Sequence, residues 1–137
     1  MKILVIDGQG GGLGKAITAA LRKALPEQPL LAVGTNAIAT TAMLKAGAQQ
    51  GATGEHAIAW QCRDANVITG PTGLVVVGAL LGEVSPAVAA AVGGSPATKL
   101  LIPSDRCGLQ VIGVRPQSMD EAVQELVQRV LRLVEKP

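Results

Sequence analysis

A glycine-rich loop after the first apolar run is the stretch of the sequence best suited to chemistry. Five of the seven residues from Gly8 to Gly14 are glycine, and Lys15 follows them. Glycine lets a ligand approach the backbone closely, and a glycine turn that leads into a helix directs free N–H groups at one point. We expect this loop to bind a phosphate-bearing small molecule, with a tight structural turn as the alternative. The expected contact residues are Asp7, Gly8, Gln9, Gly10, Gly11, Gly12, Leu13, Gly14 and Lys15.

The loop matches the nucleotide-binding P-loop only in part. A P-loop has the pattern G-x-x-x-x-G-K-[ST], and Gly14-Lys15 supplies its end, but Gln9 replaces the first glycine. Ala16 replaces the residue whose hydroxyl binds Mg²⁺, and the later apolar runs end without the acidic residue of a Walker B element. A degenerate P-loop-like site for ATP or GTP therefore stays an alternative.

The dinucleotide-binding fingerprint fits the loop better. Gly8, Gly12 and Gly14 have the spacing G-x-x-x-G-x-G, and the stretch GGLGKAI resembles the start of a short-chain dehydrogenase/reductase. This resemblance implies NAD or NADP as the cofactor. The next apolar run ends in Thr35 and Asn36, which we expect to contact the ribose or its 2′-phosphate; no acidic residue or arginine there distinguishes NAD from NADP. The chain contains no tyrosine, which excludes the catalysis of that superfamily.

Further polar residues near the ends of predicted strands are candidates for the same site. The turn Gly70-Pro71-Thr72 is expected to form the second wall of the ligand crevice, or else a plain turn. Asp7 is expected to orient the glycine loop through backbone N–H bonds; binding a metal or a ribose is the alternative, because an acid beside a phosphate needs a cation or a proton. Lys15 either neutralises phosphate charge or extends into solvent.

Two residues are weaker candidates for catalysis. His56, the only histidine, is a candidate general base, and a surface or capping role is the alternative. Cys107 follows Arg106, whose guanidinium would lower the pKa of the thiol, and a buried structural thiol is the alternative. Glu83 is the only charged residue from 65 to 98, so it must be paired, protonated or at an interface.

Apolar runs alternate with segments of helical periodicity along the chain. The predicted strands are 2–6, 30–34, 66–70, 99–103 and 109–114, with 74–78 as an alternative strand. The first predicted helices are 13–25, a segment from a cap at Asn36 to Gly47, and a short helix from a cap at Thr53 to about Cys62. Two further helices are predicted within 74–92, and the second of them starts near Ser85 and Pro86. A final helix begins with a capping box of Ser118 and Glu121.

This alternation indicates a three-layer, Rossmann-like, doubly wound α/β fold. We expect a mainly parallel sheet of about five strands with helices on both faces. The strand 66–70 is expected beside the first strand, which places a switch point and the ligand crevice at the carboxyl ends of these strands. The short connection before 109–114 favours an antiparallel or edge position for that strand. Residues 1–137 are predicted to form one nucleotide-binding domain.

Motifs along nearly the whole chain resemble one bacterial family. The stretches VIDGQGGGLGKAI, GTNAIATTAMLKAGA, GATGEHAI, GPTG, LGEVSPA and IPSDRC are similar to those of the family DUF3842. The resemblance implies a small stand-alone α/β domain, and it assigns neither a reaction nor a catalytic residue.

Composition argues against several classes of protein. A net charge of +2 and a single aromatic residue, Trp60, argue against nucleic-acid binding. Two widely spaced cysteines and one histidine argue against a metal site, and reduced thiols fit a cytoplasmic protein. Glycine and proline cut the uncharged stretch 67–82 into pieces too short to span a membrane. Only 16% of the residues are charged, which predicts a homo-oligomer.

These patterns together predict a cytoplasmic protein that binds NAD, NADP or a related phosphate-bearing ligand. One alternative is a non-catalytic regulatory or assembly module whose apolar segment 74–92 joins subunits. Another is a small enzyme that uses His56 or Cys107. The sequence assigns no substrate and no reaction.

Overall fold

Five parallel strands form one sheet in the residues that the structure describes, 1–104 and 108–136 of a computed structural model. The strands are β1 (Ile3–Asp7), β2 (Leu30–Gly34), β3 (Gln50–Thr53), β4 (Val67–Pro71) and β5 (Thr98–Ile102). Their order in the sheet is β3-β2-β1-β4-β5, and every neighbouring pair is parallel. The predicted fold class and the expected position of β4 beside β1 are confirmed.

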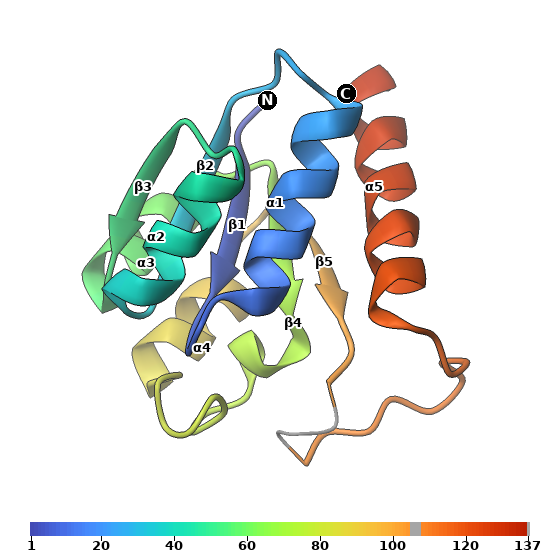
Figure 1. Ribbon diagram of the computed structural model, residues 1–137. Helices are drawn as coiled ribbons and strands as arrows, with labels where there is room; N and C mark the ends of the chain where they lie inside the picture. The colour runs from blue at the N-terminus through green and yellow to red at the C-terminus, as the bar shows by residue number, and fades with distance from the viewer. Residues whose placement is uncertain (105–107, 137) are drawn as a thin grey trace.

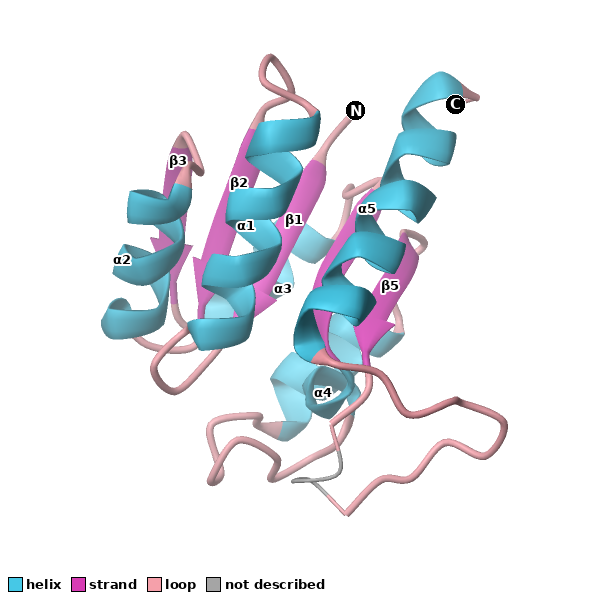
Figure 2. Ribbon diagram, turned by 45° about the vertical axis from the view of Figure 1, so that its right-hand side comes forward, coloured by secondary structure: helices cyan, strands magenta, loops and turns pink. Residues whose placement is uncertain are grey.

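Helices cover both faces of the sheet and give three layers (Figures 1 and 2). The helices are α1 (Gly12–Ala24), α2 (Ala37–Ala46), α3 (Glu55–Cys62), α4 (Pro86–Gly93) and α5 (Met119–Glu135), with a 3-10 turn, η1 (Thr72–Val75), after β4. Side chains of Ile3 and Val5 pack with α1, α2 and α5, and those of Leu4 and Ile6 pack with α3 and α4. Because alternate side chains of a strand point to opposite faces, β1 contributes to both cores.

Local capping signals predicted three of the helix starts correctly. The side chains of Asn36 and Ser85 each accept a bond from the backbone N–H of the third helical residue. Pro86 occupies the first position of α4, where its missing N–H costs nothing. Ser118 and Glu121 form the expected reciprocal capping box at the start of α5.

The sequence did not predict β3. Its residues, QGAT, show no apolar alternation, and they become a strand because β2 offers parallel backbone partners at the edge of the sheet. Thr53, predicted as the cap of α3, is instead the last residue of β3, and its hydroxyl lies 2.8 Å from that of Thr40. Gly54 occupies the cap position.

The predicted strand 109–114 is wrong. This stretch is exposed and pairs with no other strand, although its apolar pattern is typical of one. Gly108 and Gly113 have φ angles of 75° and 93°, which bend the chain away from an extended course, and the side chain of Ile112 is 94% exposed. The apolar alternation does not produce a strand here because no strand among the described residues pairs with this stretch.

The first of the two helices predicted within 74–92, and the alternative strand 74–78, are also wrong. The chain instead forms η1 and then a series of turns up to Val84. Leu80 and Leu81 have left-handed φ angles of 58° and 55°, a conformation that interrupts a right-handed helix. This segment is important below because it carries Glu83.

The carboxyl ends of the parallel strands bring the candidate residues to one edge of the sheet. In the register of the central strands, Asp7 at the end of β1 pairs with Gly34 at the end of β2. The glycine loop after β1, the connection after β2 and the turn after β4 therefore lie at the same edge, at the lower end of the strands in Figure 1. This is the edge at which open α/β sheets bind ligands.

Candidate functional site

Asp7 fixes the shape of the glycine loop from inside. Its side chain is buried, one oxygen accepts the backbone N–H of Gly8 at 2.8 Å, and the other accepts that of Gly14 at 2.6 Å. The expected orienting role of Asp7 is confirmed by these two bonds. Burial raises the pKa of the Asp7 carboxyl above its ordinary value; the two N–H bonds act in the opposite direction, and the nearby charge of Glu83 adds to the rise.

Three glycines in the loop are required by close packing. A Cβ on Gly14 would lie 2.8 Å from the Cβ of Asp7, so glycine allows α1 to approach β1 closely there. Gly11 has a φ of 73°, and a Cβ there would lie 2.8 Å from the Cα of Ala39 in α2. A Cβ on Gly8 would lie 2.6 Å from a carboxylate oxygen of Glu83.

The other two glycines face open space. A Cβ on Gly10 or on Gly12 would meet no atom within 4 Å. The backbone N–H groups of Gly10, Gly12 and Leu13 donate to no group in the described ranges. The first turn of α1 thus presents unpaired donors at its positive end, because the first N–H groups of a helix have no partner within it.

The Glu83 carboxylate, which the sequence analysis did not place at the site, binds the start of the glycine loop. One oxygen of Glu83, Oε1, accepts the backbone N–H of Gln9 at 2.8 Å, the Thr35 hydroxyl, and the side-chain amide of Asn36 at 3.0 Å. Asn36 also donates to the backbone oxygen of Gln9 at 3.0 Å. Thr35 and Asn36, both predicted site residues, are therefore brought together with the glycine loop around one anionic group.

These bonds explain how Glu83 is accommodated among apolar residues. Burial alone raises the pKa of Glu83, but the bonds from Gln9, Thr35 and Asn36 outweigh it and hold the pKa below its ordinary value. Of the three states that the sequence allowed, the structure shows the paired one. The only sequence signal for it was an isolated charge in a long apolar stretch, which could not name its partners.

The predicted turn Gly70-Pro71-Thr72 is instead the end of β4 and the start of η1; it lies at the same edge but donates nothing to this cluster. Gly70 lies so close to β1 that a Cβ would come within 2.3 Å of the backbone oxygen of Ile6, and Gly70 and Pro71 are buried. The Thr72 hydroxyl accepts the backbone N–H of Ser104 at 3.1 Å. Residues 70–72 therefore connect the ends of β1 and β5, and Thr72 is partly exposed beside them.

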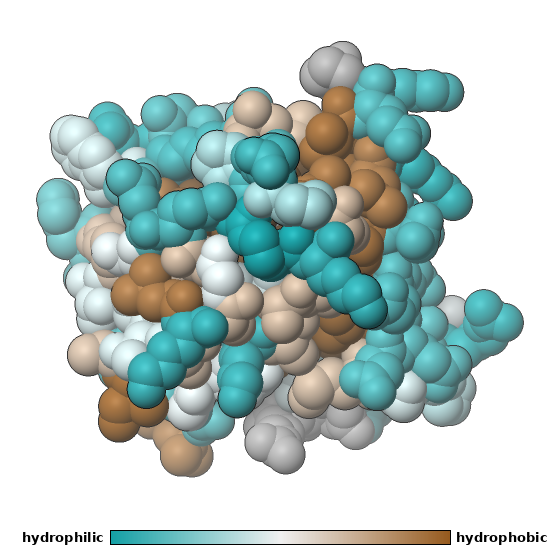
Figure 3. Space-filling model, turned by 45° about the horizontal axis from the view of Figure 1, so that its top comes forward, coloured by the Kyte–Doolittle hydropathy of each residue, from teal (hydrophilic) through white to brown (hydrophobic). Residues whose placement is uncertain are grey.

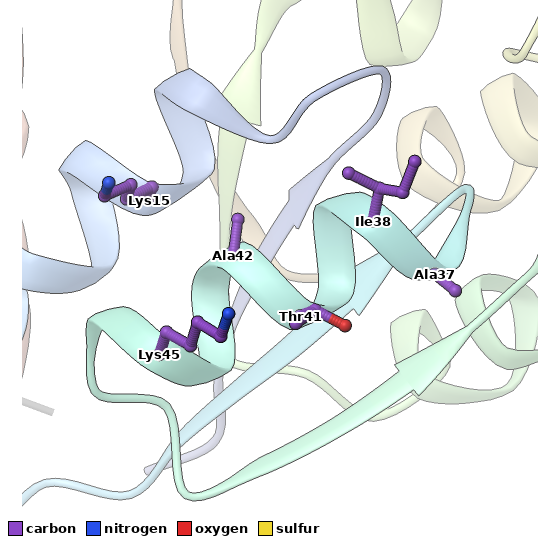
Figure 4. A pocket seen from close by; sticks show the side chains of 6 residues that line it. All are labelled: Lys15, Ala37, Ile38, Thr41, Ala42 and Lys45. Atoms are coloured by element: carbon purple, nitrogen blue, oxygen red, sulfur yellow. The ribbon is translucent and has the colours of Figure 1, made fainter.

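Lys15 lines a hollow on the outer side of α1 and α2. The hollow has a volume of about 420 Å³ and is lined by Lys15, Ala37, Ile38, Thr41, Ala42 and Lys45 (Figure 4). It includes no residue from 7 to 14, so it lies next to the glycine loop without containing it. Two lysines give it positive charge, and Lys15 belongs to the first turn of α1.

Of the two candidate catalytic residues, His56 does not join this cluster. His56 is exposed on α3, which covers the other face of the sheet from α1, and its ring lies 6.0 Å from that of Trp60. Cys107 and Arg106 lie outside the described residues. Within the described ranges, no three His, Cys, Asp or Glu side chains are grouped so as to hold a metal ion. Among these residues, no helix is long and apolar enough to cross a membrane.

Comparisons with known proteins give the family and the fold. The family model described as Domain of unknown function (DUF3842) matches residues 2–135. The chain is similar to the crystal structure of a dodecameric FMN-dependent UbiX-like decarboxylase from Escherichia coli O157:H7, with 18% sequence identity, a TM-score of 0.52, and coverage of 98% of this chain and 95% of that chain. At this identity the likeness shows the fold alone. A comparison with curated proteins found no match. Because the family model spans nearly the whole chain, as the motifs predicted, this protein belongs to the DUF3842 family.

Proposed function

We propose that this chain is a nucleotide-binding domain that holds the phosphate of a small molecule at the start of α1. One observation carries the proposal: the N–H groups of Gly10, Gly12 and Leu13 have no acceptor in the described part of the chain, and the space above both glycines is open. An anion placed there would accept these bonds and face the positive end of the helix dipole. The bonds from Asp7 support the proposal because they hold the loop in shape before any ligand binds.

The proposed ligand is a nucleotide-type molecule. Open α/β sheets bind nucleotides at the carboxyl ends of their central strands, where β1 and β4 meet in this chain. The UbiX-like protein of similar fold is FMN-dependent, so FMN joins NAD and NADP as a candidate cofactor. In this proposal Lys15 supplies positive charge, Thr35 and Asn36 border the ligand beside β2, and the turn 70–72 borders it beside β4.

Titration of the purified protein tests the proposal. We expect saturable binding of FMN, NAD⁺ or NADP⁺ in a calorimetric titration, together with a rise in melting temperature. Stabilisation by ATP–Mg²⁺ or GTP–Mg²⁺ alone would favour the degenerate P-loop alternative. No heat and no stabilisation with any of these ligands, or with inorganic phosphate, would refute the proposal.

The variant Gly12→Val tests the position of the phosphate. The backbone of Gly12 is not left-handed and its surroundings are open, so valine fits the fold while its side chain covers the N–H groups of the first turn. We expect a loss of affinity of about tenfold or more with an almost unchanged melting temperature. The matched control is Ala87→Val, an exposed position in the first turn of α4. Unchanged affinity in Gly12→Val would contradict the assignment of the loop.

A second candidate function is assembly through the segment that follows η1. Val77 and Leu81 are 60% and 93% exposed there. In the view of Figure 3, hydrophobic residues form one larger continuous patch at the upper right and smaller separate patches at the left. The UbiX-like protein is dodecameric, which is a further reason to measure the oligomeric state. We expect light scattering to show a homo-oligomer that Val77→Lys dissociates and Ile38→Lys, a control on α2, leaves intact. A monomer at micromolar concentration would contradict this candidate.

A further inference from the structure

Glu83 places an anion of the chain itself on donors of the kind that bind ligand oxygens. Its Oε1 atom accepts the Gln9 N–H, the Thr35 hydroxyl and the Asn36 amide, and we call these three donors the oxyanion cluster. A backbone N–H, a hydroxyl and an amide are the neutral donors with which proteins bind phosphate and carboxylate oxygens. Gln9 directly precedes Gly10, so the oxyanion cluster continues the row of free donors in the loop.

The Glu83 side chain also covers the first part of the loop. A Cβ on Gly8 would lie 2.6 Å from Glu83 Oε1 and 2.9 Å from the Cδ1 of Leu80. No such cover lies over Gly10 or Gly12. A ligand therefore has access to the N–H groups of Gly10, Gly12 and Leu13 while Glu83 occupies the oxyanion cluster.

The backbone around Glu83 is held by its own hydrogen bonds. The N–H of Gly78 donates to the oxygen of Val84 at 2.8 Å, and the N–H of Val84 donates to the oxygen of Ala79 at 3.1 Å. Ala79 and Val84 are buried, so the segment is anchored on both sides of Glu83. Release of the carboxylate from the oxyanion cluster therefore requires none of these backbone bonds to break.

We propose that the Glu83 carboxylate is a built-in competitor of the ligand: it occupies the oxyanion cluster in the free protein, and an anionic oxygen of the phosphate-bearing ligand displaces it. This inference rests on the proposed function. The N–H of Gln9 carries one proton and makes one strong bond, so Glu83 and a ligand oxyanion cannot both use it. Two anions side by side on the same donors also repel each other. The affinity for ligand is thus reduced by the fraction of molecules in which Glu83 is seated.

Titration with inorganic phosphate, followed in ¹H–¹⁵N spectra, tests the inference on wild type and three variants. Glu83→Gln keeps the shape of the side chain and removes its charge, so we expect phosphate to bind about tenfold more tightly. Glu55→Gln is the matched control, because Glu55 is an exposed carboxylate that accepts a bond from Ser85 and touches none of the three donors. The double variant Thr35→Val/Glu83→Gln removes one donor of the cluster, and we expect it to lose most of the gain.

The outcomes separate this inference from the proposed function. In wild type we expect phosphate to shift the amide signal of Gln9 together with those of Gly10, Gly12 and Leu13. Shifts at Gly10, Gly12 and Leu13 without a shift at Gln9 would overturn the inference and leave the proposed function standing. An equal gain in Glu55→Gln would overturn it too, because the effect would then be one of net charge. Unchanged or weaker binding in a folded Glu83→Gln would also overturn it, and absence of binding in all proteins would overturn both.

Discussion

The carboxylate of Asp7 accepts the backbone N–H of Gly14, seven residues further along the chain, at 2.6 Å. The same side chain accepts the N–H of Gly8 at 2.8 Å, so one buried residue closes the glycine loop at both ends. These two N–H groups are used within the protein, whereas those of Gly10, Gly12 and Leu13 donate to no group in the described residues. The shape of the candidate site therefore depends on one buried carboxylate.

Replacement of Asp7 by alanine should destabilise the protein. The variant leaves the N–H groups of Gly8 and Gly14 without their acceptor in a buried place, which costs on the order of 1–3 kcal/mol for each such group. Relief of the buried charge offsets part of this cost, so we expect a net loss of about 2 kcal/mol in the free energy of unfolding, measured with urea. The control is Asp64→Ala, whose exposed carboxylate pairs with Lys2 and should matter much less. Equal stability of Asp7→Ala and wild type would contradict the orienting role.

Alanine should have opposite effects at two adjacent glycines. Gly11 is left-handed and a Cβ there would lie 2.8 Å from backbone of α2, so Gly11→Ala should cost on the order of 1–3 kcal/mol. Gly12 is the first residue of α1 in open space, and Gly12→Ala should be neutral or stabilising by up to about 1 kcal/mol. Thermal unfolding of the two variants checks the difference. A stable Gly11→Ala would show that the loop does not adopt this conformation.

The bonds to Glu83 should appear as a pH dependence of stability. The pKa of Glu83 in the folded chain lies below its ordinary value of 4.5, so the unfolded chain takes up this proton at a higher pH than the folded chain. Its stabilisation is fully present above the ordinary pKa and is lost as the pH falls through the lower folded-state value. Wild type should therefore be more stable than Glu83→Gln in urea at neutral pH, and the difference should shrink as the pH falls below 4.5 and through the lower folded-state pKa.

Asp7 does not disturb this comparison. The pKa of Asp7 is raised, so its contribution has the opposite sign: stability falls as the pH rises from the ordinary value through the raised one. Both proteins contain Asp7, and most of this contribution cancels in the difference between them. A difference that is independent of pH would show that Glu83 does not make these bonds in solution.

Cys62 should be inert in the folded protein. Burial raises the pKa of its thiol to about 11, although Lys2 and Lys99 act in the opposite direction. Because the thiolate is the reactive form, only about a thousandth of the molecules would be reactive at pH 8 even with full access. In a Cys107→Ser variant, we expect a disulfide reagent to titrate no thiol within minutes until urea is added. Rapid reaction without urea would mean that α3 does not bury this residue.

Much of the fold was predictable because its signals are local. Capping side chains mark the starts of three helices, at Asn36, Ser85 and Ser118. Strands β1 and β4 are short apolar runs typical of strands buried on both faces. The two errors at strands share one cause. Residues 50–53 pair without a sequence pattern and residues 109–114 have a pattern without a partner, because strand formation depends on a neighbour in space.

The candidate site was predictable where it follows the chain and not where it joins distant segments. The glycine loop and Asp7 are adjacent in sequence, and their spacing was sufficient to predict the orienting bonds. Glu83 lies 74 residues after Gln9, and the stretch just before it was predicted as a helix. No local rule connects an isolated acid with Thr35 and Asn36, so this contact appeared only with the fold.

The exposed tip of the segment that carries Glu83 has a thermodynamic consequence. Leu81 lies two residues before Glu83 and is 93% exposed, so its side chain is accessible for contact with another molecule. Such a contact would favour either the seated or the released carboxylate, and linkage requires that phosphate then alter the strength of that contact by the same factor. In this arrangement, binding of a molecule at Leu81 and binding of a ligand at the glycine loop would each change the affinity of the other without direct contact.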